Sequence, residues 1–319
     1  MFSFFASIFG LSDNNAHTYP DSLIINAIER ALDATDPRMR ILPGYRKALR
    51  SAVIHAIDHV IALVDALPAA VLATPQSREA SSSLAALFTS APRMNELLLA
   101  DNNLRTFLAA AQPAPAQVYG LLVVQRNEKT GFGYALVDDQ LLNDVQQTQV
   151  SFDEHRLLDL AESENENRRL LKHRAYDYLL SVALRQVTEQ RDEREKLSQQ
   201  RSLLRCKLDI IQKGGNGFSR DMGPQDRNAL QARLDEIEMQ LAELGPVHEL
   251  LQNNMAIVVN VLNEAEKHLW RETVNLRLDK HYVLHSDGDE SVAPIAFTDI
   301  CDSEGKRVTV QLLFKNVDQ

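Results

Sequence analysis

The sequence is poor in cysteine, which limits both its chemistry and its compartment. Its 319 residues include two cysteines, Cys206 and Cys301, which stand far apart and belong to no metal-binding spacing. Neither a disulfide framework nor a cysteine-based zinc site is expected from such a pair. The segment before Arg30 contains no lysine or arginine, so the basic region of a secretory signal is missing. We therefore expect a cytoplasmic protein.

Clusters of positive charge are missing from the sequence as well. Lysine and arginine together number 34, against 44 aspartate and glutamate residues, which gives a formal net charge of −10. Proteins with a general affinity for nucleic acid neutralise phosphates with grouped lysines and arginines, and no segment carries such a stripe. We therefore expect no nucleic-acid partner.

Long apolar segments without charge are also lacking. The best candidate for a membrane span, residues 51–73, has sufficient length. It contains Asp58 and Asp65, however, and Pro68 breaks it. Because charged groups in the middle of a bilayer are costly, we predict a buried helix of a soluble domain over Tyr45–Leu67. Apolar residues recur along it every three or four positions.

Around this helix the sequence predicts a helical N-terminal domain over residues 21–111. Asp21 begins an earlier helix with a capping pattern, and further helices are predicted near 84–90 and 93–111. The Gln-Pro-Ala-Pro-Ala segment at 112–116 ends the domain, because its prolines cannot continue a helix.

Two long segments of helical character, 153–213 and 225–280, dominate the rest of the chain. A glycine-rich break at 213–224 separates them and permits the chain to reverse. Apolar residues in the second segment follow intervals of four and three, the spacing of a coiled-coil seam: Leu230, Leu234, Ile237, Leu241 and Leu244. The seam of the first segment is imperfect, since polar residues such as Arg194 interrupt it. We predict an antiparallel coiled-coil arm over 153–280.

Strand-like segments lie on either side of this arm, and each contains a turn-rich stretch. Residues 127–131 predict the turn of one hairpin, and Gly131-Phe132-Gly133 is interpreted as part of the same turn chemistry. Residues 302–306 predict the turn of a second hairpin. Because a lone hairpin is marginally stable in water, we expect both to join in one small platform formed by 117–150 and 281–319.

Residues 1–20 read as an apolar peptide followed by a polar linker. Large apolar side chains crowd the first ten positions: Phe2, Phe4, Phe5, Ile8 and Phe9. One interpretation is that the peptide folds back into a groove of the body. The other is an interfacial anchor that enters a bilayer or a groove of a partner. With no cation in the peptide, membrane contact would be weak.

One pair of histidines has the spacing of a metal chelate. His55 and His59 lie one helical turn apart, and Asp58 stands beside them in an echo of the inverted zinc-hydrolase pattern. Aspartate in place of glutamate would reach less well as a general base, and the sequence offers no third ligand. The alternative is that both histidines pack on a mostly apolar helix. We expect no cofactor.

The glycine-rich break is the other candidate site. It lacks the Gly-Lys-Ser/Thr ending of a phosphate-binding loop and follows a helix, whereas a nucleotide loop follows a strand. As the tip of an arm it could instead present side chains to a partner. The residues assigned to this contact are Gly214, Asn216, Phe218 and Arg220.

The expected fold is mainly α with a small β portion: a helical N-terminal domain and a small antiparallel β platform that carries a long antiparallel coiled-coil helical hairpin. The leading hypothesis for function is a non-enzymatic scaffold or adaptor whose arm contacts a protein partner or a second copy of the chain. The alternatives are a metal-dependent, hydrolase-like enzyme that uses His55 and His59, and a peripheral membrane protein anchored by residues 1–10.

Overall fold

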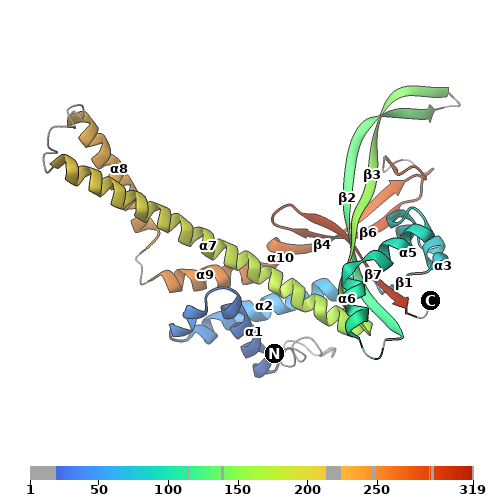
Figure 1. Ribbon diagram of the computed structural model, residues 1–319, viewed down its shortest axis with the longest axis horizontal. Helices are drawn as coiled ribbons and strands as arrows, with labels where there is room; N and C mark the ends of the chain where they lie inside the picture. The colour runs from blue at the N-terminus through green and yellow to red at the C-terminus, as the bar shows by residue number, and fades with distance from the viewer. Residues whose placement is uncertain are drawn as a thin grey trace. The chain divides into compact units, whose positions relative to one another are not determined.

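The chain divides into two units, whose helices and strands Figure 1 labels. The computed structural model describes residues 19–111, 113, 115–137, 140–212, 224–245, 249–286, 288 and 291–317. Unit 1 contains Ile57–Tyr176 and Ala265–Gln319, and unit 2 contains His17–Ala56 and Asp177–Glu264. A bilayer-crossing helix is not found among the described residues, because every helix there is too short or too polar.

Unit 2 is helical. Its elements are α1 (Asp21–Ala34), the 3-10 helix η2 (Pro37–Ile41), the first half of α2 (Tyr45–Asp65), the greater part of α7 (Glu164–Gln212), α8 (Pro224–Glu243) and α9 (Leu250–Asn263). The buried residues of α1 recur every three or four positions, as an apolar stripe requires: Leu23, Ile24, Ala27, Ile28, Ala31 and Leu32. Arg30 of α1 donates two hydrogen bonds to Asp177 of α7, at 3.0 and 2.7 Å. The helix predicted from Asp21 is confirmed.

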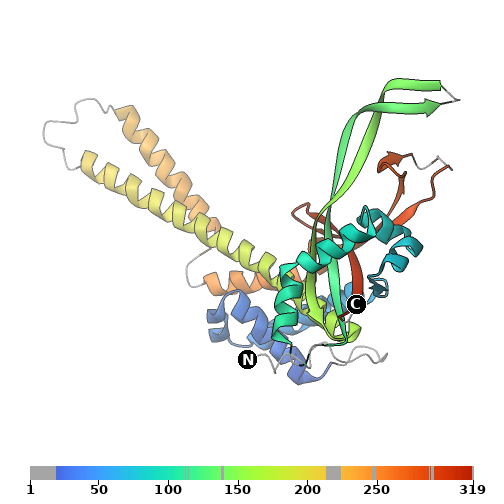
Figure 2. The same cartoon turned by 45° about the vertical axis from the view of Figure 1, so that its right-hand side comes forward.

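The helices α7 and α8 lie side by side and run in opposite directions (Figures 1 and 2). Leu208 of α7 and both Leu234 and Ile237 of α8 are buried, although the surrounding positions are mostly exposed. An ion pair between Arg205 and Glu238 joins the flanks of the two helices. The apolar seam is therefore covered by the partner helix within the same chain.

The second helix of the predicted arm is shorter than expected. The chain leaves α8 at Leu244, and Gly245 adopts a φ of +75° that other residues rarely take. Arg194 of α7, which interrupts the predicted seam, donates a hydrogen bond at 3.3 Å to the carbonyl of Leu244. The expectation of helix throughout 225–280 is wrong, because a strand begins at Leu269.

A buried carboxylate joins η2 to α9. Asp36 is 6% exposed and accepts side-chain hydrogen bonds from Arg38, at 2.9 and 2.7 Å. It also accepts one from the amide of Asn254, at 3.0 Å. The hydrogen bonds from Arg38 are the main cause that lowers the pKa of Asp36 below its ordinary value of 3.8. The ionised form of Asp36 therefore stabilises the folded unit.

We expect Asp36→Asn to destabilise unit 2 at neutral pH by about 1–3 kcal/mol, because charge-assisted hydrogen bonds are lost. The folded pKa lies below the unfolded one, so this stability is present above the unfolded value. It is lost as the pH falls through the folded value. Urea unfolding followed by far-ultraviolet circular dichroism, at about pH 7 and about pH 3, checks the prediction. A gap between wild type and variant that does not shrink in acid contradicts it.

Unit 1 is built on a seven-stranded sheet. Its strands are β1 (Val71–Leu72), β2 (Gln117–Val137), β3 (Gln140–Ala161), β4 (Leu269–Leu278), β5 (Val283–His285), β6 (Ile295–Asp302) and β7 (Arg307–Asn316), in the order β1-β7-β2-β3-β5-β4-β6. A further pairing joins β7 to β6. Its helices are α3 (Pro75–Ala80), α4 (Ser82–Leu87), α5 (Ala91–Ala100), α6 (Asn102–Ala110) and α10 (Ala265–His268), with the end of α2 and the start of α7.

The expectation of a small antiparallel β platform is wrong. The sheet is mixed, since β1 is parallel to β7, and β4 lies where the sequence predicts helix. In β4, Val274, Leu276 and Leu278 alternate with polar residues and pack into the core, which is the period of a strand. The turn predicted at 127–131 is also wrong, because β2 continues through it and Gly131 pairs with Gln147 of β3.

Three β-bulges interrupt the pairing of β2 with β3. At each of three register shifts, one residue of β2 stands opposite two residues of β3. An acidic residue of β3 with a positive φ lies at each shift: Asp144, Glu154 and Asp159. Short polar side chains such as aspartate tolerate this conformation better than most others, and bulges of this kind increase the twist of a strand.

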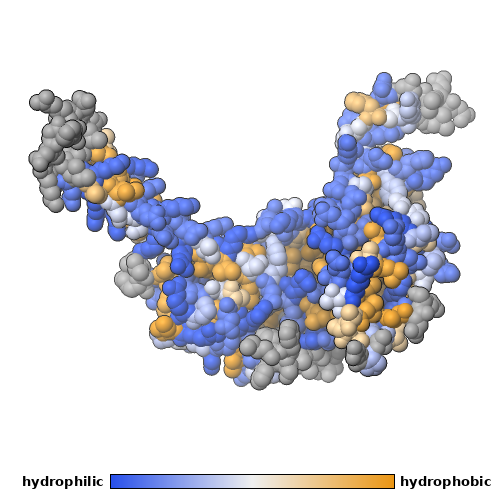
Figure 3. Space-filling model, viewed as in Figure 1, coloured by the Kyte–Doolittle hydropathy of each residue, from blue (hydrophilic) through white to orange (hydrophobic). Residues whose placement is uncertain are grey.

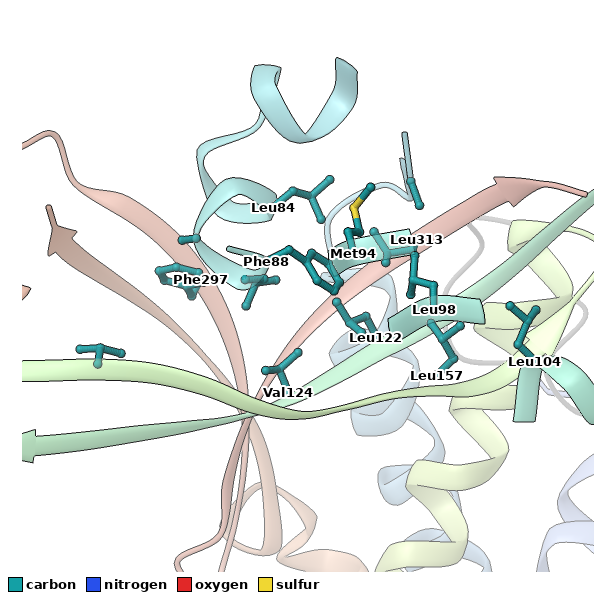
Figure 4. Close-up of a cluster of buried hydrophobic side chains, with 14 of the residues drawn as sticks. Leu84, Phe88, Met94, Leu98, Leu104, Leu122, Val124, Leu157, Phe297 and Leu313 are labelled. Atoms are coloured by element: carbon teal, nitrogen blue, oxygen red, sulfur yellow. The ribbon is translucent and has the colours of Figure 1, made fainter. Parts of the chain in front are cut away.

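The core of unit 1 lies on both faces of the sheet. On one face, α4, α5 and α6 cover a cluster that Figure 4 shows, with Leu84, Phe88, Met94, Leu98, Leu104, Leu122, Val124, Leu157, Phe297 and Leu313 among its members. On the other face, Val64 at the end of α2 and Leu67 just after it pack with Leu171 of α7 against β2 and β7. The middle of the sheet is thus buried on both sides, and its remaining exposed parts are the places to look for a site.

Candidate functional site

The far end of the β2–β3 hairpin extends beyond its neighbouring strands. β7 pairs with β2 as far as Val124, and β5 pairs with β3 at Thr148 and Gln149. Within the described residues, the pairings of 125–137 and 140–147 are with one another. In both views this end runs past the other strands of unit 1 (Figures 1 and 2). We call it the hairpin end. Its outer edges present backbone N–H and C=O groups to solvent.

Two aromatic side chains are exposed on the hairpin end. Phe132 is 78% exposed and Tyr134 is 71% exposed. Because side chains alternate along a strand, the two share one face of β2. Thr130 belongs to this face, and its hydroxyl lies 3.3 Å from that of Thr148 on β3. Figure 3 shows a small hydrophobic patch near this end, above a hydrophilic stem. Exposed aromatic groups of this kind are typical of contact surfaces.

Charged side chains cluster at the base of the hairpin end. Two alternate rows of the register, which share one face of the sheet, hold Glu272, Asp299 and Arg307 together with Thr309, Trp270 and Cys301. By strand alternation these side chains share the sheet face of Phe297, which α4–α6 cover elsewhere. This face of the sheet is therefore apolar at Phe297 and charged at Asp299, two residues further along β6.

The centre of this cluster is a buried ion pair. The side chain of Asp299 is 0% exposed and that of Arg126 is 7% exposed, with Oδ2 and Nη1 separated by 3.0 Å. The hydroxyl of Thr309 donates a hydrogen bond to the other Asp299 oxygen at 2.8 Å. Among the described residues, neither Arg126 Nη1 nor Asp299 Oδ2 has a partner in hydrogen-bond geometry. The two atoms thus attract each other as charges without forming a well-directed hydrogen bond.

A hollow of about 470 Å³ lies beside the ion pair. Its lining consists of Gln125, Arg126, Glu128, Gly305, Lys306 and Arg307. The lining holds three cations and one carboxylate, a formal charge of +2. Acidic groups accompany these cations: Lys306 lies 2.7 Å from Glu304 and Arg307 lies 3.0 Å from Glu272. We call it the basic hollow. It suits a polar ligand that carries negative charge.

The cluster does not have the features of a catalytic centre. Cys301 is its nucleophile by residue type, but burial raises the pKa of the thiol. The sulfur lies 3.8 Å from an oxygen of Glu272, whose charge also favours the protonated form. A protonated, buried thiol is a weak nucleophile. The arrangement therefore supports binding better than covalent chemistry.

The histidines singled out in the sequence lie on α2. His59 Nε2 donates a hydrogen bond at 2.7 Å to the carbonyl of Leu269, and its Nδ1 lies 4.0 Å from Glu266. Within the stretches that the structure describes, His55, Asp58 and His59 belong to no group of three or more His, Cys, Asp and Glu side chains that could hold a metal ion. One nitrogen of His59 is thus engaged in holding α2 to the start of β4. The metal site stays a prediction without a third ligand.

Two other sets of predicted site residues lie outside the described residues. These are the apolar residues near the N-terminus, Phe2, Phe4, Phe5, Ile8 and Phe9, and the tip residues Gly214, Asn216, Phe218 and Arg220. Both assignments remain predictions.

Sequence reasoning missed the hairpin end and the basic hollow. The alternation of Glu128, Thr130, Phe132 and Tyr134 is a strand signal, but the glycines between them favoured a turn. Gly133 has a packing role in the strand, since a methyl group in place of its hydrogen would come within 2.3 Å of the Gln147 side chain. No local pattern joins Arg126 to Asp299, because β7 brings them together across the sheet.

Comparisons of the chain with models of protein families, with curated proteins and with solved structures give no match. The fold and the composition alone do not identify a function. The function must therefore be inferred from the two surfaces described above, the hairpin end and the basic hollow.

Proposed function

We propose that the protein is a non-enzymatic adaptor that binds a protein partner, and that the hairpin end is its contact surface. The observation that carries the proposal is the joint exposure of Phe132 and Tyr134 on the part of β2 that pairs with β3 alone among the described residues. A two-stranded ribbon is marginally stable in water. A partner that covers it would stabilise it and would bury both rings.

Strand addition is the natural mode of contact for such a surface. An unpaired strand edge offers a row of backbone donors and acceptors to any extended segment. Native proteins commonly protect long edges with charges or prolines, and the β2 edge from Thr130 to Tyr134 has neither. The stretch Thr-Gly-Phe-Gly-Tyr therefore lacks the usual protection against pairing with another strand.

The coiled-coil arm fits the same proposal as a spacer or a second contact. Its seam residues Leu208, Leu234 and Ile237 are buried within the chain, so they offer little apolar surface to another protein. Contact through the arm, or dimer formation through it, stays a proposal. We also propose a cytoplasmic location, which the unbridged cysteines Cys206 and Cys301 support.

Replacing both rings, Phe132→Ser with Tyr134→Ser, is expected to reduce partner capture by about tenfold or more. Aromatic anchors at the centre of an interface commonly contribute about 2 kcal/mol or more each. The measurement is quantitative mass spectrometry of proteins captured by the tagged full chain from a lysate of its native host. Light scattering of the same samples shows whether a second copy of the chain is the partner.

The matched control is Ile41→Ser, which removes an apolar side chain of η2 that is 78% exposed and lies outside both the hairpin end and the arm. Captured proteins that disappear with the double variant and persist with the control support the hairpin end. Unchanged capture by the double variant, with circular dichroism showing an intact fold, removes the hairpin end from the proposal.

A further inference from the structure

We infer that the partner segment adds to the β2 edge as an antiparallel strand and places its C-terminal carboxylate in the basic hollow. The inference rests on the proposed function, because it names the occupant of the hairpin end. It joins two observations that are independent of each other: the open edge of β2 and the charged lining where that edge begins.

The direction of the added strand follows from β7. β7 is antiparallel to β2, and its first residue paired with β2 is Thr309, opposite Val124. Beyond Val124 the same edge of β2 is open among the described residues. A segment that continues the line of β7 along this edge, with the same direction, runs from the level of Tyr134 toward the level of Arg126. Its C-terminal end therefore comes closest to the start of β7.

The turn between β6 and β7 closes this path. Gly305, Lys306 and Arg307 form one wall of the hollow, and Gln125, Arg126 and Glu128 of β2 form the other. An added strand that reaches this level meets the turn and has to end or bend away. A chain terminus fits such a blocked end better than the middle of a peptide does.

The charge of the lining favours a carboxylate at this point. Lys306 and Arg307 are exposed, with side chains 73% and 46% accessible, so both can reach a ligand. Arg126 is buried behind them and forms an ion pair with Asp299, so Lys306 and Arg307 are the cations of the lining that a ligand can reach. A terminal carboxylate brings two acceptor oxygens, which guanidinium groups bind in pairs. Glu128, the one carboxylate of the lining, already lies 3.2 Å from Arg126 Nε.

The hairpin end then contacts the upstream part of the segment. With the last residue opposite Arg126, the residues six and eight positions earlier lie opposite Phe132 and Tyr134, since each step along one strand matches one step along the other. Apolar residues at those two positions would cover the rings. The expected ligand is therefore an extended C-terminal segment of about ten residues with apolar side chains six and eight positions before its end.

The test uses a library of synthetic decapeptides, fixed by their N-termini, in which each sequence is present with a free C-terminus and as the C-terminal amide. The full chain is bound to the library, and affinities of the selected peptides are measured by fluorescence anisotropy. We expect free-acid peptides to be selected, and amidation to weaken binding by about tenfold or more, because charge-assisted hydrogen bonds are lost.

Variants locate the carboxylate. Lys306→Gln with Arg307→Gln is expected to weaken the free acid about tenfold and to leave the amide unchanged. The control, Arg156→Gln, removes a 64% exposed cation of β3 and should change neither. The Phe132→Ser, Tyr134→Ser variant should weaken both peptide forms alike. Arg126 is left intact, because its removal would disturb the fold.

Each result decides between the two proposals. Equal binding of acid and amide that is lost in the aromatic variant overturns the carboxylate inference and leaves the hairpin end as the contact surface. If the library contains no binders but partner capture depends on Phe132 and Tyr134, the carboxylate inference is also overturned and the hairpin end remains the contact surface. Peptide binding that is insensitive to the aromatic variant overturns both. Binding that requires the free acid, the two basic residues and the aromatic pair supports both.

Discussion

Replacing Phe88 by alanine is expected to lower the free energy of unfolding of unit 1 by about 3–5 kcal/mol. The ring is 1% exposed and belongs to the cluster that α4–α6 form with the sheet (Figure 4). It also stacks on His155, with ring centroids 4.9 Å apart. Removing it loses the transfer energy of the ring and leaves a cavity that the surrounding helices and strands fill only in part.

Urea unfolding followed by tryptophan fluorescence measures this effect, because the single tryptophan, Trp270, lies on β4 of the same unit. Phe132→Ala is the matched control: it removes the same ring from a site that is 78% exposed. It should change stability by less than about 0.5 kcal/mol. A similar loss for both variants would show that Phe88 does not anchor the core.

Replacing Arg126 by methionine is expected to cost about 3–5 kcal/mol, since it leaves the buried carboxylate of Asp299 without its cation. The Asp299 side chain is 0% exposed, and its next cation, Arg307, has its Nε 4.0 Å away. The hydrogen bond from Thr309 remains, but it does not balance a buried charge.

The double variant, Arg126→Met with Asp299→Asn, tests the physical reason. Asparagine removes the charge and keeps an oxygen for Thr309, so it should restore a large part of the stability lost in Arg126→Met. The same fluorescence experiment measures both variants. A double variant as unstable as the single one would show that the side chain of Arg126 acts through packing, not through charge.

A helix of this chain could be predicted where its apolar residues recur at helical spacing within a short stretch of sequence. The helix α2 begins at Tyr45 as predicted, because its apolar residues recur at helical spacing over many turns. The helix near 93–111 is predicted as one, yet Asp101 divides it into α5 and α6. Asp101 caps α6 through its hydrogen bond from Leu104 N. That capping signal was present in the sequence and outweighed the apolar period.

The strands β3 and β4 escaped prediction for a physical reason. β3 carries acidic residues where strands usually carry β-branched ones, and its pairing depends on β2 and on bulges at Glu154 and Asp159. Neither dependence is visible in a local window. The basic hollow is harder still, because Arg126 and Asp299 lie 173 positions apart and meet only through the sheet register. Composition alone gave no sign of them.

The bulges determine how the length of the hairpin can change during evolution. Deleting one ordinary residue of β3 would turn the following side chains to the opposite face, up to the next bulge. Deleting Glu154 would instead convert a bulge into regular pairing, and Leu157 would still face the core beside Leu122. Relatives of this protein with a shorter or longer β3 should therefore differ at the positions near 144, 154 and 159, and seldom between them.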